Sequence, residues 1–312
     1  MSLYLVTGGA GFIGSHIVDK LVQLGEKVRV LDNFVTGKKE NLSKSINKIE
    51  LINGDIRDRK KLQVALKSVD FVLHQAALRS VPRSVDDPIS TNDVNITGTL
   101  LLLEQSRKCK VQRVVYAASS SAYGDSPELP KKETQLPAPV SPYAVSKLAG
   151  EYYCSMYNKL YGLETISLRY FNVFGPRQDP ASEYAAVVPK FIELALKGKT
   201  LEIHSDGLQS RDFSYIDNVV SANLLAVKSK KGIGEVFNIA CGEKWTILDI
   251  AETIGRIIDK KLKYHHTQTR KGDVRHTLAD ISKAKKMLGY KIITNFEEGM
   301  RKTVEYFLKS HK

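Results

Sequence analysis

The chain is poor in cysteine and has no long apolar run. The first feature argues against a disulfide-rich or metal-binding protein, and the second against a membrane protein. Its three cysteines (Cys109, Cys154 and Cys241) are far apart and match no metal-ligand spacing. We therefore expect reduced, structural cysteines of a cytoplasmic protein and no metal site. No window approaches the ~20 apolar residues of a membrane span. The N-terminus lacks the basic region of a signal peptide, so we expect no association with a membrane.

Positive charge is in excess, but it is not concentrated. The net charge is +13 over 312 residues, while the hydrophobic and charged fractions, 42% and 26%, are those of an ordinary soluble protein. The lysines are scattered, and no basic stripe with interleaved aromatic residues is present. This distribution disfavours nucleic acid as the natural ligand and favours a small anionic substrate.

Apolar β runs alternate with helical patterns over the first 170 or so residues. The strands are expected at 3–7, 27–32, 49–55, 69–77, 111–119 and 163–175, with long helices at 91–108 and 143–160. This alternation predicts a Rossmann-type α/β fold, a doubly wound parallel sheet with helices on both faces. We expect a nucleotide-binding domain at 1–172 and a smaller α/β substrate lobe, mainly at 173–312. The segment 213–241 is expected to return to the first domain.

The glycine-rich run GGAGFIG lies between the first strand and the first helix. Glycines at 8, 9, 11 and 14 let the backbone approach a pyrophosphate, and the helix N-terminus offers free N–H groups. Asp32 ends the second strand, where a carboxylate accepts hydrogen bonds from an adenosine ribose and repels a 2′-phosphate. The pattern therefore predicts NAD rather than NADP. Asp55 and Ile56, after the third strand, are placed beside the adenine by position alone.

The stretch SPYAVSK places Tyr143 and Lys147 one helical turn apart. Ser141 suits an N-cap and Pro142 the first helical position, so both side chains should share a face near the start of a helix. A neighbouring ammonium group favours the phenolate form of a tyrosine. Taken alone, this common spacing favours a surface pair, so the rest of the chain must decide.

Further motifs connect the glycine run with this pair. In order, TGGAGFIG, Asp32, HQAA, YAASSSAYG, SPYAVSK and LRYFNVFGP resemble the extended short-chain dehydrogenase/reductase family, and within it the nucleotide-sugar 4-epimerases. SRDFSYIDNV and RKGDVRHTLAD resemble the nucleotide-diphosphate contacts of that group, so the likeness covers nearly the whole chain. The resemblance implies that Tyr143 is the catalytic acid/base, assisted by Lys147 and Ser119. Lys147 would also hold the nicotinamide ribose and lower the pKa of Tyr143.

The same resemblance implies a mechanism and a set of contacts. Tyr143 as phenolate would take the proton of the sugar C4 hydroxyl while the C4 hydride goes to NAD⁺; the 4-keto sugar would rotate, and the hydride would return to its other face. The implied NAD contacts are Gly8, Gly11, Phe12, Ile13, Gly14, Asp32, Asn33, Asp55, Ile56, Gln75, Ala76, Ala77, Asn95, Tyr143, Lys147 and Tyr170. The implied substrate contacts are Arg79, Ser80, Ser84, Ser120, Ser121, Asn172, Gln178, Val187, Arg211, Arg270, Asp273 and Thr277.

Among the substrate contacts, Arg211 and Arg270 would hold the two phosphates, a task suited to guanidinium groups. Asp273 would bind the uridine ribose. Sugar 4,6-dehydratases carry an Asp–Glu pair where this chain has Ser120 and Ser121, which argues against dehydration.

Thr277 stands where UDP-galactose epimerases can carry a bulky tyrosine. A smaller residue leaves room for a 2-acetamido group, so interconversion of UDP-N-acetylglucosamine and UDP-N-acetylgalactosamine is the first expectation. UDP-glucose/UDP-galactose remains an alternative. Arg79 is either a loop arginine or the partner of a substrate acid, so UDP-glucuronic acid or an acidic N-acetyl sugar also remains open.

Two broader expectations complete the prediction. The resemblance implies a homodimer in which helices 91–108 and 143–160 form a four-helix bundle with their counterparts. The alternative from another functional class is a dinucleotide sensor without catalysis, but such proteins usually lack the Tyr–Lys pair or the serine.

Overall fold

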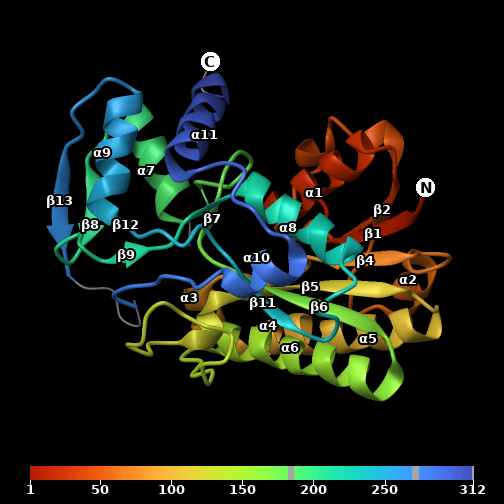
Figure 1. The fold of residues 1–312 in the computed structure, drawn as a ribbon. Helices are drawn as coiled ribbons and strands as arrows, with labels where there is room; N and C mark the ends of the chain where they lie inside the picture. Colours follow the sequence, from red (N-terminus) through yellow and green to blue (C-terminus); the bar gives the residue numbers. More distant parts are fainter. Residues whose placement is uncertain (182–185, 269–273, 311–312) are drawn as a thin grey trace.

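The computed structural model describes residues 1–181, 186–268 and 274–310. Its centre is a seven-stranded parallel sheet in the order β11-β6-β5-β4-β1-β2-β3 (Figure 1), which confirms the predicted fold class. The strands are β1 (Leu3–Thr7), β2 (Lys27–Asp32), β3 (Ile49–Asn53), β4 (Phe71–His74), β5 (Arg113–Ser119), β6 (Glu164–Tyr170) and β11 (Val236–Ile239).

Helices cover both faces of this sheet. In Figure 1, α1 (Phe12–Gln23) and α8 (Ile216–Lys228) lie above it, and α5 (Gly98–Lys108) and α6 (Pro142–Tyr161) lie below it, with α2 (Arg59–Ala65) nearby. Strand β5 shows why two cores form. Val115 and Ala117 join the core on the α1/α8 side, while Val114, Tyr116 and Ala118 join the other. Successive strand residues point to opposite faces, so one buried strand supplies both layers.

The chain leaves the first domain and then returns to it. β11 pairs in parallel with β6, and α8 packs beside α1. Strand β11 and helix α8, both within residues 213–241, therefore belong to the central sheet and to one of its helical layers. The segment follows the short strands β7 (Val173–Phe174) and β9 (Ser210–Arg211), and the short strand β10 (Ser214–Tyr215) lies just inside its start.

The second lobe lies at one end of the sheet (Figure 1). Its remaining elements are α7 (Val187–Leu196), β8 (Leu201–His204), β12 (Trp245–Thr246), α9 (Ile247–Ile257), β13 (Tyr264–Thr267), α10 (Ser282–Leu288) and α11 (Phe296–Ser310). Trp245 stacks on Phe296 with ring centroids 4.2 Å apart, and Phe174 and Phe213 pack against the same ring. Phe296 belongs to the same core as α1 and α8, so the described residues of the lobe share the core of the nucleotide-binding domain.

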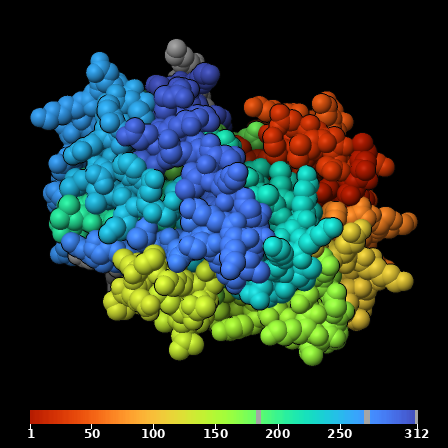
Figure 2. Space-filling view, in the orientation of Figure 1, coloured from red at the N-terminus to blue at the C-terminus, as the bar shows by residue number. Residues whose placement is uncertain are grey.

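A loop from the first domain reaches across to the C-terminal part of the chain. In Figure 2, the yellow segment around residue 130 lies against the blue segment near residue 280. Lys131 N donates to Leu278 O at 2.7 Å, and Asp280 N donates to Lys131 O at 2.9 Å. These backbone bonds fix the segment that carries Thr277 relative to the nucleotide-binding domain.

The two long predicted helices are present, with differences at their ends. The helical run before α5 begins at α4 (Pro88–Asn92), because Asp87 caps it by accepting from Ser90 N at 3.0 Å, and it passes through a π-helical turn at Asp93–Thr97. α6 starts at Pro142 after the Ser141 cap. None of the helices in the described ranges combines the length and apolarity that crossing a membrane requires.

A close helix–strand contact beneath α6 gives a test of the fold. A Cβ atom on Gly150 would lie 2.2 Å from the hydroxyl oxygen of Tyr116, a side chain that is 1% exposed. Gly150→Ala is therefore expected to destabilise the protein by about 1–3 kcal/mol from overpacking, partly offset by the better helix propensity of alanine. Urea denaturation measures this change. Adding Tyr116→Phe removes the nearest atom and should recover part of the loss; equal losses with and without Tyr116→Phe would contradict this packing.

Candidate active site

A cavity of about 390 Å³ opens at the carboxyl ends of β1, β2, β4 and β5. It lies where the chain order reverses between β1 and β4, the usual ligand position in open parallel sheets. Every predicted NAD contact except Asn95 lines this cavity. Of the predicted substrate contacts, Arg79 lines it.

The glycine loop forms the cavity wall next to α1. Gly8 has a φ of +67°, and a Cβ there would lie 2.7 Å from Ala76 N. A Cβ on Gly14 would lie 2.2 Å from Gly8 O, so only glycine allows α1 to start this close to β1. The N-cap Gly11 provides no side-chain hydrogen bond to the helix, which leaves the first N–H groups of α1 for a bound anion.

Asp32 lies at the end of β2, as predicted. Its carboxylate is 7% exposed and accepts from Ala10 N at 2.9 Å and from Phe34 N at 2.8 Å. Burial raises the pKa of Asp32, and these two backbone hydrogen bonds oppose the rise. The carboxylate is thus fixed between the glycine loop and the turn after β2.

Residues that follow β2 and β3 complete this side of the cavity. Asn33 donates to Asp55 Oδ2 at 2.8 Å, while Ile56 is buried. Hydrogen bonds from the Arg57 side chain are the main cause that lowers the pKa of Asp55 to about 2. Arg57 also lines the cavity and was not among the predicted contacts.

Asn95 lies behind the loop that follows β4 and does not line the cavity. It is 1% exposed; its Oδ1 accepts from Leu78 N at 2.8 Å, and its Nδ2 donates to Leu78 O at 2.9 Å and to Ser146 Oγ at 3.0 Å. The amide thereby fastens the loop that carries Arg79 to α6. In this structure Asn95 holds the loop after β4 in place and does not face the cavity where a contact to the nicotinamide was expected.

Tyr143 and Lys147, two of the three predicted catalytic residues, line the cavity. Ser119 ends β5, and Tyr143 and Lys147 lie one turn apart on α6. The Lys147 side chain is buried, its Nζ donates to Ala117 O at 2.9 Å, and it lies 5.1 Å from the ring centre of Tyr116. Ser121 donates to Ser119 Oγ at 2.9 Å. The surface-pair alternative for Tyr143 and Lys147 is therefore wrong.

The surroundings perturb both titratable groups. Burial raises the pKa of Tyr143, and a hydrogen bond with Ser119 and the charge of Arg79 oppose that rise. Burial also lowers the pKa of Lys147 to about 8, opposed mainly by the charge of Glu151. The expected effect of Lys147 on the pKa of Tyr143 stays a prediction; Ser119 and Arg79 are the groups that oppose the rise here.

A second group of predicted residues meets near the end of β6. Asn172 has a φ of +31°, and its Nδ2 donates to Asp212 O at 3.1 Å and lies 3.5 Å from Thr277 Oγ1. Thr277 Oγ1 also accepts from Asp212 N at 3.4 Å. Arg211 donates to Ser210 O at 2.9 Å and to Arg275 O at 3.2 Å. Segments far apart in sequence, near residues 172, 211 and 277, thus meet at this place.

The other predicted substrate contacts differ in their surroundings. Ser80 accepts from Arg83 N at 3.3 Å as a helix cap, and the buried Ser84 donates to Val81 O at 2.6 Å, so both hydroxyls are engaged within α3 (Val81–Asp86). Gln178 donates to Val173 O at 3.1 Å; among the described residues its buried Oε1 has no partner, which suits a contact to a ligand donor. Ser120 and Ser121 open the turn after β5, and Val187 begins α7. Arg270 and Asp273 lie outside the described residues.

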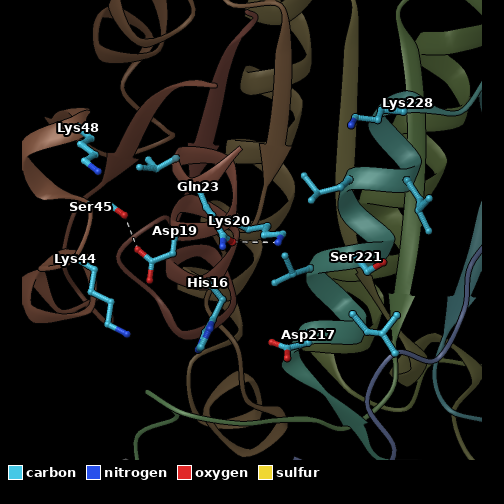
Figure 3. Close-up of a pocket in the computed structure, with 15 residues that line it drawn as sticks. His16, Asp19, Lys20, Gln23, Lys44, Ser45, Lys48, Asp217, Ser221 and Lys228 are labelled. Atoms are coloured by element: carbon cyan, nitrogen blue, oxygen red, sulfur yellow. Dashed lines mark hydrogen bonds between the residues drawn. The ribbon is translucent and has the colours of Figure 1, made fainter. Parts of the chain in front are cut away.

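A different cavity, of about 910 Å³, lies between α1 and α8 (Figure 3). Lys20, Lys44, Lys48 and Lys228 surround it, and none of the predicted site residues lines it. The α1 side chains at its edge nevertheless support the substrate side. His16 Nε2 lies 3.0 Å from Pro176 O, and Asp19 pairs with Arg177, so α1 holds the loop that carries Gln178.

Comparison with known proteins agrees with this geometry. Residues 4–240 match the family model described as "NAD dependent epimerase/dehydratase family". The chain belongs to this family. The membership confirms the resemblance drawn from the motifs and NAD as the cofactor.

Three relatives show how far the similarity extends. A putative UDP-glucose 4-epimerase of Methanocaldococcus jannaschii is 40% identical, over 99% of this chain and 100% of its own length. A UDP-N-acetylglucosamine 4-epimerase from Methanobrevibacter ruminantium, solved with UDP-N-acetylmuramic acid, has a TM-score of 0.95 and 41% identity over 99% of both chains. A UDP-glucose 4-epimerase from Thermus thermophilus, solved with NAD, has a TM-score of 0.91 and 38% identity over 98% of this chain and 99% of its own. The expected enzyme class, an NAD-dependent nucleotide-sugar 4-epimerase, is confirmed, but the relatives differ in their sugars.

Several cavity residues were missed from the sequence. Ala117 and Ala118 line the cavity immediately before Ser119, and Thr36 lines it beyond Asp32. Their position after strand ends was the available signal, because in a parallel sheet these ends share one edge. Small residues there give the ligand room, but nothing in their chemistry distinguishes them from core residues.

The close contact between Gly14 and Gly8 predicts that a side chain at position 14 weakens the binding of NAD. In Gly14→Ala the Cβ must displace backbone at 2.2 Å, so the glycine loop moves and bound NAD should fall at least tenfold. Cofactor content of the purified protein, measured after acid release, tests this. Lys20→Ala, an exposed change on the same helix, should keep its NAD. Full NAD content in Gly14→Ala would show that the loop tolerates a side chain.

Proposed function

We propose that the enzyme interconverts UDP-N-acetylglucosamine and UDP-N-acetylgalactosamine. Thr277 is the observation that carries this choice. Its hydroxyl accepts from Asp212 N and lies 3.5 Å from Asn172 Nδ2. By the family resemblance, this short side chain stands where a tyrosine would close the sugar site. The space that a threonine leaves is suited to a 2-acetamido group, and the relative from Methanobrevibacter ruminantium acts on such a sugar.

The residues of the cavity suit NAD. The free N-terminus of α1 and the narrow Gly8–Gly14 contact would hold the pyrophosphate, and Asp32 would accept from the adenosine ribose. When bound, NAD⁺ supplies the hydride acceptor and donor and a positive charge. The protein supplies position and electrostatics.

The proton transfer is assigned to Tyr143. As phenolate it takes the proton of the sugar C4 hydroxyl, and as phenol it returns a proton to the 4-keto oxygen after the sugar has turned. Ser119 hydrogen-bonds to Tyr143 and would orient the same sugar oxygen. Lys147 places an ammonium group on the same helix face, and its bond to Ala117 O fixes its position.

Arg79 supports a second candidate substrate, an acidic UDP-sugar. Its exposed side chain lines the cavity, and its positive charge acts on Tyr143. A substrate carboxylate near this guanidinium would be favourably placed. The relative solved with UDP-N-acetylmuramic acid shows that a protein of this fold can hold an acidic N-acetyl sugar.

Product analysis by NMR distinguishes these substrates. With NAD⁺ supplied, UDP-N-acetylglucosamine should convert at least tenfold faster than UDP-glucose or UDP-glucuronic acid. Thr277→Tyr should reduce turnover of the N-acetyl sugar at least tenfold and leave turnover of UDP-glucose largely intact. Thr277→Ser, which stays small, is the matched control. Preference for UDP-glucuronic acid, lost in Arg79→Ala, would establish the second candidate instead.

We also propose a homodimer formed by α5 and α6. Val145 and Tyr152 lie two turns apart on α6, 47% and 61% exposed, so they form an apolar stripe on its outer side. Pairing with a second copy would cover this stripe.

Light scattering after size-exclusion chromatography tests the dimer. The wild type should have twice the mass of the 34.8 kDa chain, and Tyr152→Glu should shift it towards the monomer, because dimerisation would bury a charge. Leu136→Glu, at a loop residue that is 88% exposed, should not alter the mass. A monomeric wild type would exclude the proposal.

A further inference from the structure

A buried ion pair lies directly behind the catalytic pair. Glu151 accepts two hydrogen bonds from Arg169, from Nε at 2.9 Å and from Nη2 at 2.7 Å. The two side chains are 3% and 4% exposed. Buried ion pairs often stabilise a fold no better than apolar residues of similar volume. Stability alone therefore does not explain this pair.

Its position on α6 suggests what it does. Tyr143, Lys147 and Glu151 follow each other at four-residue intervals and share one helix face. Arg169 lies on β6, with its guanidinium carbon 4.6 Å from the ring centre of Tyr123. The ion pair thus continues the row of catalytic residues into the core.

Lys147 faces few other charges. His74 on β4 is neutral, because burial and the charge of Lys147 lower its pKa to about 3. Cys154 on α6 is also neutral, since burial raises its pKa to about 12. Tyr116 on β5 presents its ring, and burial raises its pKa well above the ordinary value. Among the described groups that act on Lys147, Glu151 is the anion at neutral pH.

The ion pair keeps Glu151 in that anionic form. Burial raises the pKa of Glu151, and the hydrogen bonds and charge of Arg169 oppose the rise, followed by the charge of Lys147. Arg169 fixes both carboxylate oxygens and so fixes the distance to Lys147. A carboxylate without this partner would be costly at the same depth.

We propose that Glu151 is a positioning residue for catalysis, which keeps the buried ammonium group of Lys147 charged, and that Arg169 holds the Glu151 carboxylate in place for this task. The inference rests on the proposed roles of Tyr143 and Lys147 in epimerisation. It assigns a function to a pair that does not line the cavity of about 390 Å³.

The charges around Lys147 determine how its pKa changes when the Glu151 carboxylate is removed. Without the Glu151 carboxylate, burial and the unpaired Arg169 both favour neutral Lys147, so its pKa falls below about 8. Activity that needs the ammonium group is then lost at a lower pH. The alkaline limb of kcat/KM should move down by about one to two pH units, the size expected for the loss of one nearby charge at an effective dielectric constant of ~20.

The test is the pH profile of Glu151→Gln holoenzyme together with the titration of Lys147 by lysine side-chain NMR, assigned with Lys147→Arg. We expect the alkaline limb and the Lys147 titration to shift down together. Glu164→Gln is the matched control, because Glu164 also pairs with a buried arginine, Arg113, on the same sheet and is remote from Lys147. Its profile should equal that of the wild type.

Other outcomes would show that Glu151 has only a structural role and does not tune Lys147. A folded Glu151→Gln with an unshifted Lys147 titration, or with an equal loss of activity at every pH, overturns the inference. If that variant does not fold, the double change Glu151→Leu with Arg169→Met removes both charges at similar volume, and it should show a smaller shift in the same direction; no shift there also overturns the inference. If the wild type epimerises no UDP-sugar, the proposed function fails, while the Lys147 titration still tests the electrostatic claim.

Discussion

The burial of one ammonium group, that of Lys147, is the constraint on which the rest of the active site depends. A charge removed from water needs fixed partners, and the fold provides them from several elements. Ala117 O accepts a hydrogen bond, the Tyr116 ring faces the ammonium group, and Glu151 supplies a counter-charge one turn along α6. The absence of a side chain at Gly150 lets α6 lie directly on Tyr116, which keeps this group of residues together.

The burial that surrounds Lys147 also disfavours ionisation of Tyr143, and the positive charge of NAD⁺ would counteract this effect. Burial raises the pKa of Tyr143, although the proposed mechanism needs its phenolate. Ser119 and Arg79 oppose the rise but do not overcome it. The cavity therefore contains a tyrosine with a raised pKa, the buried ammonium group of Lys147 and a site for a positively charged dinucleotide. On this account, the proton of Tyr143 becomes mobile when NAD⁺ is bound, so proton transfer and hydride transfer are restricted to the same complex.

Short-range patterns were predicted well because local spacing determines them. The glycine loop, Asp32 and the Tyr143–Lys147 turn lie where strand ends and helix starts require them. Contacts that depend on the tertiary fold were not predictable from one sequence. Asn95 bonds to the backbone of Leu78 instead of lining the cavity, and Ser80 and Ser84 are engaged within their own helix. The Glu151–Arg169 pair joins α6 to β6, and no motif indicated it. Arg270 and Asp273 remain predictions.

The pKa of Tyr143 in the NAD-loaded enzyme is the most direct measure of this account. Tyrosinate absorbance near ~295 nm is titrated for the wild type and for Tyr143→Phe, and the difference isolates one tyrosine. The account predicts ionisation well below the ordinary value of ~10, towards neutral pH. A value at or above ~10 in the loaded enzyme would mean that burial dominates even with NAD⁺ bound, and Tyr143 would then not be the base.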